Sequence, residues 1–241
     1  MGKATLEGWR RTLGCRRHLI AQIRKIAPGV RRDYVEALLG KPKWQSTLIC
    51  TRLVASGDEV KVDFSMETWP LSQMGYRVTW SESDALVMYG ITTTSWWFRP
   101  RMIVGDTRIR LGKSLLSELG SPGEHQVWNG ARRFGYLEKQ FIGNPGGYRT
   151  WYVGVNDCGY QAVSPTRDWE SGEAEAAWMP DDKRDAYRAS APINTVVVCG
   201  RTGTSATGPS STTGLPSCTG SPSAAVRKGS QTPTCTSSPS P

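Results

Sequence analysis

The sequence has few of the residues from which catalytic and metal sites are usually built. It holds two histidines, His18 and His125, and none of its six cysteines stands in a Cys-x-x-Cys pair. Structural zinc sites need closely spaced cysteine and histidine ligands. A serine or cysteine hydrolase needs a base beside its nucleophile, and histidine usually fills that role. We therefore expect no metal, no cofactor, no small-molecule substrate and no enzymatic activity.

Long apolar runs are missing as well. The longest, at residues 85–91 and 193–199, fall far short of the roughly 20 residues that cross a bilayer. No apolar stretch of signal-peptide length follows the basic start. Disulfide frameworks belong mainly to exported chains, so we expect mostly free cysteines in a soluble, cytoplasmic protein.

Positive charge is plentiful and concentrated near the N-terminus. The formal net charge is +9 over 241 residues, and most of the excess lies in the first 45. Apolar residues recur there at helical spacing, at Trp9, Leu13, Ile20, Ile23 and Ala27, and the pattern ends at Pro28 and Gly29. This pattern predicts a basic amphipathic helix within residues 1–28. The cations expected to contact an anionic surface are Arg10, Arg11, Arg16, Arg17, Arg24 and Lys25.

Three roles are open to this helix. It could lie on an anionic membrane with Trp9, Leu13 and Ile20 in the interface. Its arginines could instead neutralise the phosphates of nucleic acid. In the third alternative, the apolar stripe packs on the rest of the protein and the arginines are simply solvated.

Helical spacing resumes at residues 30–39, so the first 39 residues should form a helical hairpin. Gly40 is the expected C-terminal cap, and Pro42 prevents continuation. The side chains expected to be buried are Val30, Tyr34, Val35, Leu38 and Leu39.

Alternating apolar and polar residues after Trp44 predict a mainly antiparallel sheet. The expected strands are 48–54 and 60–64, joined by a turn at 56–58, followed by 76–80, 85–91, 96–98, 107–111, 134–142, 148–155 and 193–198. One further helix is expected at residues 112–122, ending at Gly120.

The hairpin of residues 134–155 allows two registers around its Pro-Gly turn. A one-residue bulge at Gly147 would place Leu137, Phe141, Trp151, Val153 and Val155 in the core. Tyr136, Tyr148 and Tyr152 would then form a possible partner face. The unbulged register would leave Glu138 and Arg149 among apolar neighbours, which costs more, so we expect the bulged one.

These elements predict an α+β domain over residues 29–199. Within it, residues 166–190 form an acidic linker or a short helix near 173–178. Serine, threonine, glycine and proline dominate residues 200–241. Such a segment cannot bury enough apolar surface to offset the entropy of ordering, and we expect a disordered tail.

Apparent catalytic motifs are weak. Gly112-Lys113-Ser114 resembles the end of a phosphate-binding loop, but Thr107 stands where that motif requires glycine. Cys158 lacks an evident base and fits a turn. Glu138 and Asp157 could form an acid and base pair beside the hairpin tyrosines, which is the enzymatic alternative, although solvated surface roles are expected for both.

Several motifs together resemble an uncharacterised domain family of actinobacterial hypothetical proteins. They are WRRTLGCRR at 9–17, LLGKP at 38–42, WWFRP at 96–100, IRLGKS at 109–114, FIGNPGGY at 141–148 and INTVVV at 193–198. Members of that family commonly carry a transmembrane helix just before the W-RRTLG segment, which begins here eight residues into the chain. The resemblance implies that Arg10, Arg11, Arg16 and Arg17 are juxtamembrane charges on the cytoplasmic side. It implies no catalytic residues.

The expected function is that of a non-enzymatic interaction module, cytoplasmic and peripheral at the inner face of the plasma membrane. Its expected partner is an anionic membrane surface or an acidic protein. The alternative is nucleic-acid binding through the N-terminal arginine-rich helix.

Overall fold

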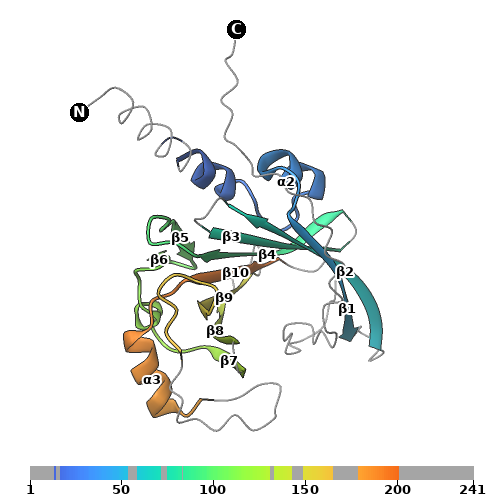
Figure 1. The fold of residues 1–241 in the computed structure, drawn as a ribbon. Coiled ribbons are helices and arrows are strands. Elements are labelled where there is room, and N and C mark those ends of the chain that lie inside the picture. Colours follow the sequence, from blue (N-terminus) through green and yellow to red (C-terminus); the bar gives the residue numbers. More distant parts are fainter. Residues whose placement is uncertain are drawn as a thin grey trace, which may run out of the picture.

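The computed structural model (Figure 1) has the predicted α+β architecture: two short helical segments near the N-terminus, mainly antiparallel sheets and one later helix. It describes residue 14 and residues 17–53, 59–71, 75–82, 84–130, 133–142, 149–164 and 179–200. Predictions for residues 1–13, for the turns at 56–58 and 144–147, for a helix near 173–178 and for the tail after residue 200 lie outside these ranges.

Most of the predicted strands are present. The helical elements are residues 17–24, α2 (Arg32–Leu39), the 3-10 helix η1 (Leu116–Leu119) and α3 (Asp181–Ser190). The strands are β1 (Trp44–Leu53), β2 (Glu59–Pro70), β3 (Gly75–Glu82), β4 (Ala85–Thr93), β5 (Arg101–Val104), β6 (Thr107–Arg110), β7 (Glu124–Gly130), β8 (Arg133–Ile142), β9 (Arg149–Asn156) and β10 (Thr195–Cys199). The sequence pattern does not predict β5, β7 or the position of α3.

Eight strands form one sheet in the order β1-β2-β3-β4-β10-β9-β8-β7, with antiparallel neighbours throughout. Two meanders, β1 to β4 and β7 to β9, make up its halves. The last strand, β10, fills the place between them, so the segment just before the tail joins both halves of the sheet. β5 and β6 pair with each other in a separate small hairpin (Figure 1).

One row of cross-strand neighbours marks the core-facing side of this sheet. The row runs across β7, β8, β9, β10 and β4 through His125, Glu138, Val153, Val196 and Ile91. Direct cross-strand partners share a face of the sheet. The three aliphatic members are fully buried. The carboxylate of Glu138 therefore lies among core side chains on this face of the sheet.

The predicted bulged register of the β8–β9 hairpin is wrong by one residue. Glu138 pairs with Val153, and Tyr136 pairs with Val155. Glu138 and Tyr136 therefore share the core face, whereas Leu137 lies on the opposite face. The expectation rested on the cost of burying Glu138. That cost is offset by a cationic partner from α3, which lies fifty residues further along the chain.

The N-terminal helical layer packs on the core much as predicted. Ile23, Ile26 and Val35 are buried, and the Trp69 indole donates a hydrogen bond to the Gly40 carbonyl at 2.7 Å, which ties the end of α2 to β2. Gly40 has a φ of 77°, a conformation that favours glycine. The prediction for Tyr34 is wrong, because its side chain is exposed.

The predicted strand at residues 96–98 is instead a turn. The Phe98 amide donates to the Ser95 carbonyl at 3.1 Å, and Phe98 is completely buried while Trp96 and Trp97 are exposed. The run of aromatic residues indicates a strand by composition. However, Pro100 follows closely, and one anchored ring with two exposed rings does not show the alternation of a strand.

The predicted helix at residues 112–122 is reduced to η1. Backbone groups upstream of η1 bond to residues 191–193 instead: the Gly112 amide donates to the Ile193 carbonyl at 2.6 Å, and the Ile193 amide donates to the Ser114 carbonyl at 2.8 Å. These groups are therefore unavailable to a helical ladder. The predicted stop at Gly120 is confirmed, with a φ of 80°.

Candidate functional site

The cations proposed for anion binding are exposed wherever the structure describes them. Arg17, Arg24 and Lys25 all have exposed side chains. The apolar residues of the same helical segment are packed inside the protein, since Ile23 and Ile26 belong to the core and Ile20 packs against it. The packing of the apolar stripe, which the third alternative predicts, is thus confirmed for the described part of this segment. Arg10, Arg11 and Arg16 lie outside the described residues.

Two of the three tyrosines predicted to form a partner face do not lie on a surface. Tyr136 and Tyr152 are buried, and Tyr148 is outside the described residues. Tyr136 belongs to the core face because of the corrected register, while Tyr152 lies on the opposite face of β9. Burial, above all, raises the pKa of Tyr152 to about 12. Tyr136 and Tyr152 are therefore not available to a partner on the protein surface.

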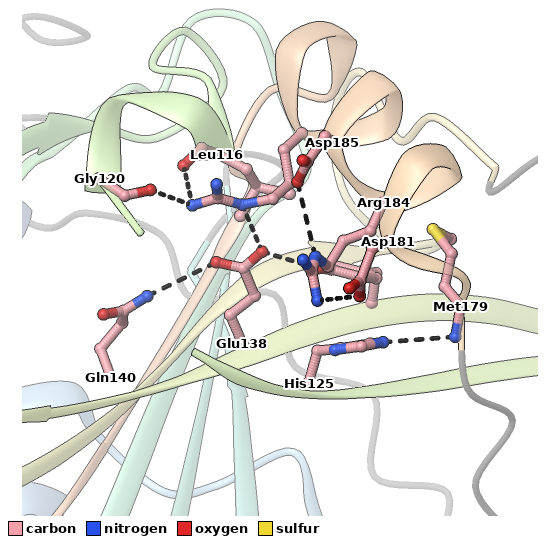
Figure 2. A network of polar contacts seen from close by, with 11 residues as sticks. Leu116, Gly120, His125, Glu138, Gln140, Met179, Asp181, Arg184 and Asp185 are labelled. Carbon is pink, nitrogen blue, oxygen red and sulfur yellow. Dashed lines mark hydrogen bonds and ion pairs between the residues drawn. The ribbon is translucent and has the colours of Figure 1, made fainter. Parts of the chain in front are cut away.

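A dense cluster of polar contacts is centred on Glu138, as Figure 2 shows. Its side chain is completely buried, and Arg188 from α3 is 7% exposed. Arg188 Nε donates to Glu138 Oε1 at 2.7 Å, and the Tyr136 hydroxyl donates to the same oxygen at 2.6 Å. Gln140 Nε2 lies 3.5 Å from Oε2. This arrangement pairs the buried charge and satisfies its hydrogen bonds.

Arg188 also binds the backbone around η1. Its Nη2 atom donates to the Gly120 carbonyl at 2.7 Å and to the Leu116 carbonyl at 3.2 Å. These carbonyls lie within and just after η1, where helices leave acceptors without intrahelical partners. One guanidinium therefore joins α3, β8 and η1.

Charge placement explains why α3 forms at residues 181–190. Asp181 and Asp182 occupy its first turn and Arg188 its last, which suits the helix dipole. Arg184 pairs with Asp181 one turn earlier at 2.9 Å. Tyr187 and Arg188 point into the protein. The signal was present in the sequence, but the high density of charge masked it.

The environment of this cluster shifts the pKa values of two further side chains, Tyr136 and His125. Burial, followed by the hydrogen bond to Glu138, raises the pKa of Tyr136, so its hydroxyl stays protonated and donates. Burial also lowers the pKa of His125, with the nearby charge of Arg184 contributing. The neutral His125 ring stacks near Tyr136, with centroids 5.6 Å apart, and its Nε2 atom accepts from the Met179 amide at 3.3 Å (Figure 2).

The structure does not bring together the proposed acid and base. Asp157 follows β9, and its amide donates to the Phe134 carbonyl, four residues before Glu138 on β8. At about 3.4 Å per residue, that offset separates the two positions by about 13 Å along the strand. Glu138 is moreover held by Arg188. Cys158 lies in the turn after β9, as predicted, and is exposed.

A second buried carboxylate also has an arginine partner. Glu67 on β2 is buried and forms an ion pair with Arg32 at the start of α2. Burial raises the pKa of Glu67, and the charge of Arg32 opposes that effect. This pair links the helical layer to the sheet, as Arg188 does on the other side of the fold.

The β5–β6 hairpin presents basic side chains that the sequence analysis did not single out. Arg101 pairs with Arg110, and Ile103 pairs with Arg108, so these four residues share one face. Arg101, Ile103 and Arg108 are exposed. The signal that could have found this face is the alternation of arginine with an apolar residue in β6, whose sequence is TRIR.

Metal and membrane-spanning features are missing from the part of the chain that the structure describes. No group of three or more histidine, cysteine, aspartate or glutamate side chains there could hold a metal ion, and none of the described helices has the length and hydropathy to cross a bilayer. No protein-family model, curated protein or solved structure matches the chain. The family resemblance therefore stays a prediction, and functional inference rests on geometry.

Proposed function

We propose that this protein is a non-enzymatic interaction module that docks through exposed cations on an anionic surface, foremost the inner face of the cytoplasmic membrane. The observation that carries the proposal is the two-sided N-terminal helical segment. Ile23 and Ile26 fix it to the core, while Arg17, Arg24 and Lys25 stay in solvent.

This arrangement favours electrostatic attraction over insertion by the helix. A helix inserts when its apolar stripe is available to the interface, and here the described apolar side chains of the segment, Ile20, Ile23 and Ile26, pack in or against the core. Each cation close to an anionic leaflet contributes about 1 kcal/mol, and the attraction falls off within a Debye length. Binding should therefore weaken as salt is added.

The non-enzymatic part of the proposal is supported by how the interior carboxylates are used. Glu138 and Glu67 are both engaged by arginines, and both join packed elements. Carboxylates held in this way are suited to fixing the fold. A general acid or base needs access to a substrate proton, and the geometry gives Glu138 none.

Vesicle co-sedimentation of the full chain tests the proposal. The wild type should bind vesicles containing phosphatidylserine and should not bind pure phosphatidylcholine. Replacing two helix cations, as Arg24→Gln with Lys25→Gln, should weaken binding about 25-fold, or about fivefold per cation. The matched control is Lys61→Gln with Lys183→Gln, which removes the same charge from exposed positions on β2 and α3 and should change binding little.

Equal and negligible sedimentation with both kinds of vesicle would overturn the membrane as partner. An acidic protein or a nucleic acid would then be the remaining class, as the N-terminal arginines also suit phosphates. A salt-dependent gel shift with double- and single-stranded oligonucleotides separates these two. If both variants weaken vesicle binding equally, net charge rather than the helix is responsible.

A further inference from the structure

Exposed apolar side chains are concentrated in one short segment. Among the large apolar residues that the structure describes, the three most exposed are Trp96 at 50%, Trp97 at 57% and Ile103 at 64%. Single exposed apolar residues are ordinary on a protein surface, but a group of them marks an interaction site. The same segment supplies Arg99, Arg101, Arg108, Arg110 and Lys113 against one carboxylate, Asp106.

The tryptophan pair is held in place. Phe98 anchors the turn in the core, and the Trp97 amide lies 3.4 Å from the Ser95 hydroxyl. The two indoles contact each other, with ring centroids 3.6 Å apart. A fixed pair of exposed rings costs less conformational entropy to bind than two free ones.

The outer face of the β5–β6 hairpin consists of Arg101, Ile103, Arg108 and Arg110, and we call it the basic hairpin face. Arg101 lies directly opposite Arg110, an arrangement of like charges that destabilises an isolated sheet. Across the described residues, none of its three arginines has a carboxylate within ion-pair distance. Among the described residues, therefore, no carboxylate neutralises the positive charge of this face.

The other side of this hairpin is fixed to the protein. Val104 and Ile109 are buried in the core, and the Leu111 amide donates to the Pro100 carbonyl at 3.1 Å. Arg99, just before β5, lies over the Tyr160 ring at 5.4 Å. The basic hairpin face is thus presented by a supported element, and its exposed arginines are not needed to hold that element.

We propose that the basic hairpin face, with Trp96 and Trp97 beside it, is a docking surface for an anionic lipid membrane. Arg101 and Arg108 would bind headgroup phosphates, and Ile103 between them would enter the interface. Indoles prefer the level of the headgroups. Trp97 precedes Arg101 by four residues, so chain length keeps their backbones within about 14 Å.

A lipid partner explains more of this surface than a nucleic acid does. A single-stranded nucleic acid would use the arginines and stack its bases on the indoles. It offers no counterpart for Ile103, an aliphatic side chain at the centre of the arginines and the most exposed large apolar residue described. A membrane interface accommodates all three kinds of side chain.

This surface is separate from the N-terminal helix, although it shares with the proposed function the choice of an anionic membrane. Its test is therefore made with its own variants of the full chain. Vesicles of phosphatidylcholine, with and without phosphatidylserine, are titrated with wild type, with Ile103→Ser, and with Arg101→Gln combined with Arg108→Gln. The matched controls are Tyr34→Ser, which removes an exposed ring from α2, and Lys61→Gln with Lys183→Gln.

We expect the double arginine variant to bind phosphatidylserine vesicles about 25-fold more weakly, or about fivefold per cation. Ile103→Ser should weaken binding several-fold, and both controls should bind as the wild type does. Bromine-labelled lipid should quench wild-type tryptophan fluorescence, and Trp96→Phe with Trp97→Phe should remove most of that quenching.

Three results would overturn the proposal. Hairpin variants that bind vesicles as well as the wild type would remove the face from the docking surface, even if the helix variants Arg24→Gln with Lys25→Gln lose binding. By contrast, loss of vesicle binding in the hairpin variants alone would support this proposal and reject the N-terminal helix as the membrane-binding element. Hairpin-dependent binding of a single-stranded oligonucleotide, with none to vesicles, would assign the face to nucleic acid. Unchanged quenching in the tryptophan variant would exclude contact of the indoles with lipid.

Discussion

Two groups of arginines in this protein lie in opposite surroundings. Arg188 is buried, donates three hydrogen bonds and faces the buried carboxylate of Glu138. Arg101 and Arg108 are exposed on a hairpin face that lacks a carboxylate partner among the described residues. The same side-chain type thus stabilises the fold in one region and leaves charge available in the other.

The difference shows which charges can be assigned to binding. A buried, fully bonded ion pair is costly to break, because each partner is left unpaired away from water. An exposed arginine contributes little to stability, so its placement is constrained mainly by what it contacts outside the protein. Stability measurements on single variants therefore separate the two groups before any ligand is known.

The largest effect on stability is expected for Arg188→Met. The substitution leaves the Glu138 carboxylate buried without its cation, which should lower the free energy of unfolding by about 3–5 kcal/mol. Urea denaturation followed by tryptophan fluorescence measures it. The control is Lys183→Met on the same helix, a position that is exposed and whose loss should stay below about 0.5 kcal/mol. Equal losses would mean that the buried pair has no special role.

A second substitution should restore part of that loss. In Arg188→Met combined with Glu138→Gln the uncompensated charge is gone, and the amide oxygen can still accept from the Tyr136 hydroxyl. The carbonyls of Leu116 and Gly120 remain without their donor, so we expect a net loss of about 1–3 kcal/mol. A double-mutant cycle measures the coupling between the two residues. Losses that simply add would contradict the pairing.

How far the fold could be predicted depends on whether local pattern or distant partners decide an element. The strands with clear alternation or a continuous apolar run, such as β2 and β4, are determined by their own residues. The helix expected at 112–122 was lost because residues 191–193, distant in sequence, take its backbone hydrogen bonds. The β8–β9 register failed for the same reason, since local pattern cannot show that Arg188 makes a buried Glu138 acceptable.

The candidate sites follow the same division. The exposed cations at Arg24 and Lys25 could be identified because helical spacing separates them from Ile23 and Ile26. The basic hairpin face was missed although arginine alternates with an apolar residue in β6. Pairing between β5 and β6 is what places Arg101, Ile103 and Arg108 on one face, and a four-residue strand gives little signal before its partner is known.

A smaller effect is expected from pH, through His125 beside the buried pair. Burial lowers the pKa of His125 in the folded protein from the ordinary value of 6.5. As the pH falls below 6.5, the unfolded chain takes up the proton first, so the folded state loses stability. The loss is present only on the acidic side. It should be smaller than that of Arg188→Met, alone or combined with Glu138→Gln, because the ring is half-buried.

Urea unfolding of wild type and His125→Gln at a series of pH values measures this effect. The difference in unfolding free energy between the two should be constant above neutral pH and should turn against the wild type as the pH decreases through 6.5. Glutamine keeps an acceptor for the Met179 amide. A pH-independent difference would show that folding leaves the pKa of His125 unchanged, and one that favours the wild type in acid would show that folding raises this pKa.

The smallest effect on stability is expected for Arg101→Gln, and it sharpens the comparison most. Arg101 is exposed and lies opposite Arg110, so removing its charge relieves repulsion. The free energy of unfolding should change by less than about 0.5 kcal/mol, with any change toward greater stability. A loss comparable with that of Arg188→Met in the same urea assay would mean that the hairpin arginines hold the fold. Their unpaired charge could then no longer be taken as evidence for a ligand.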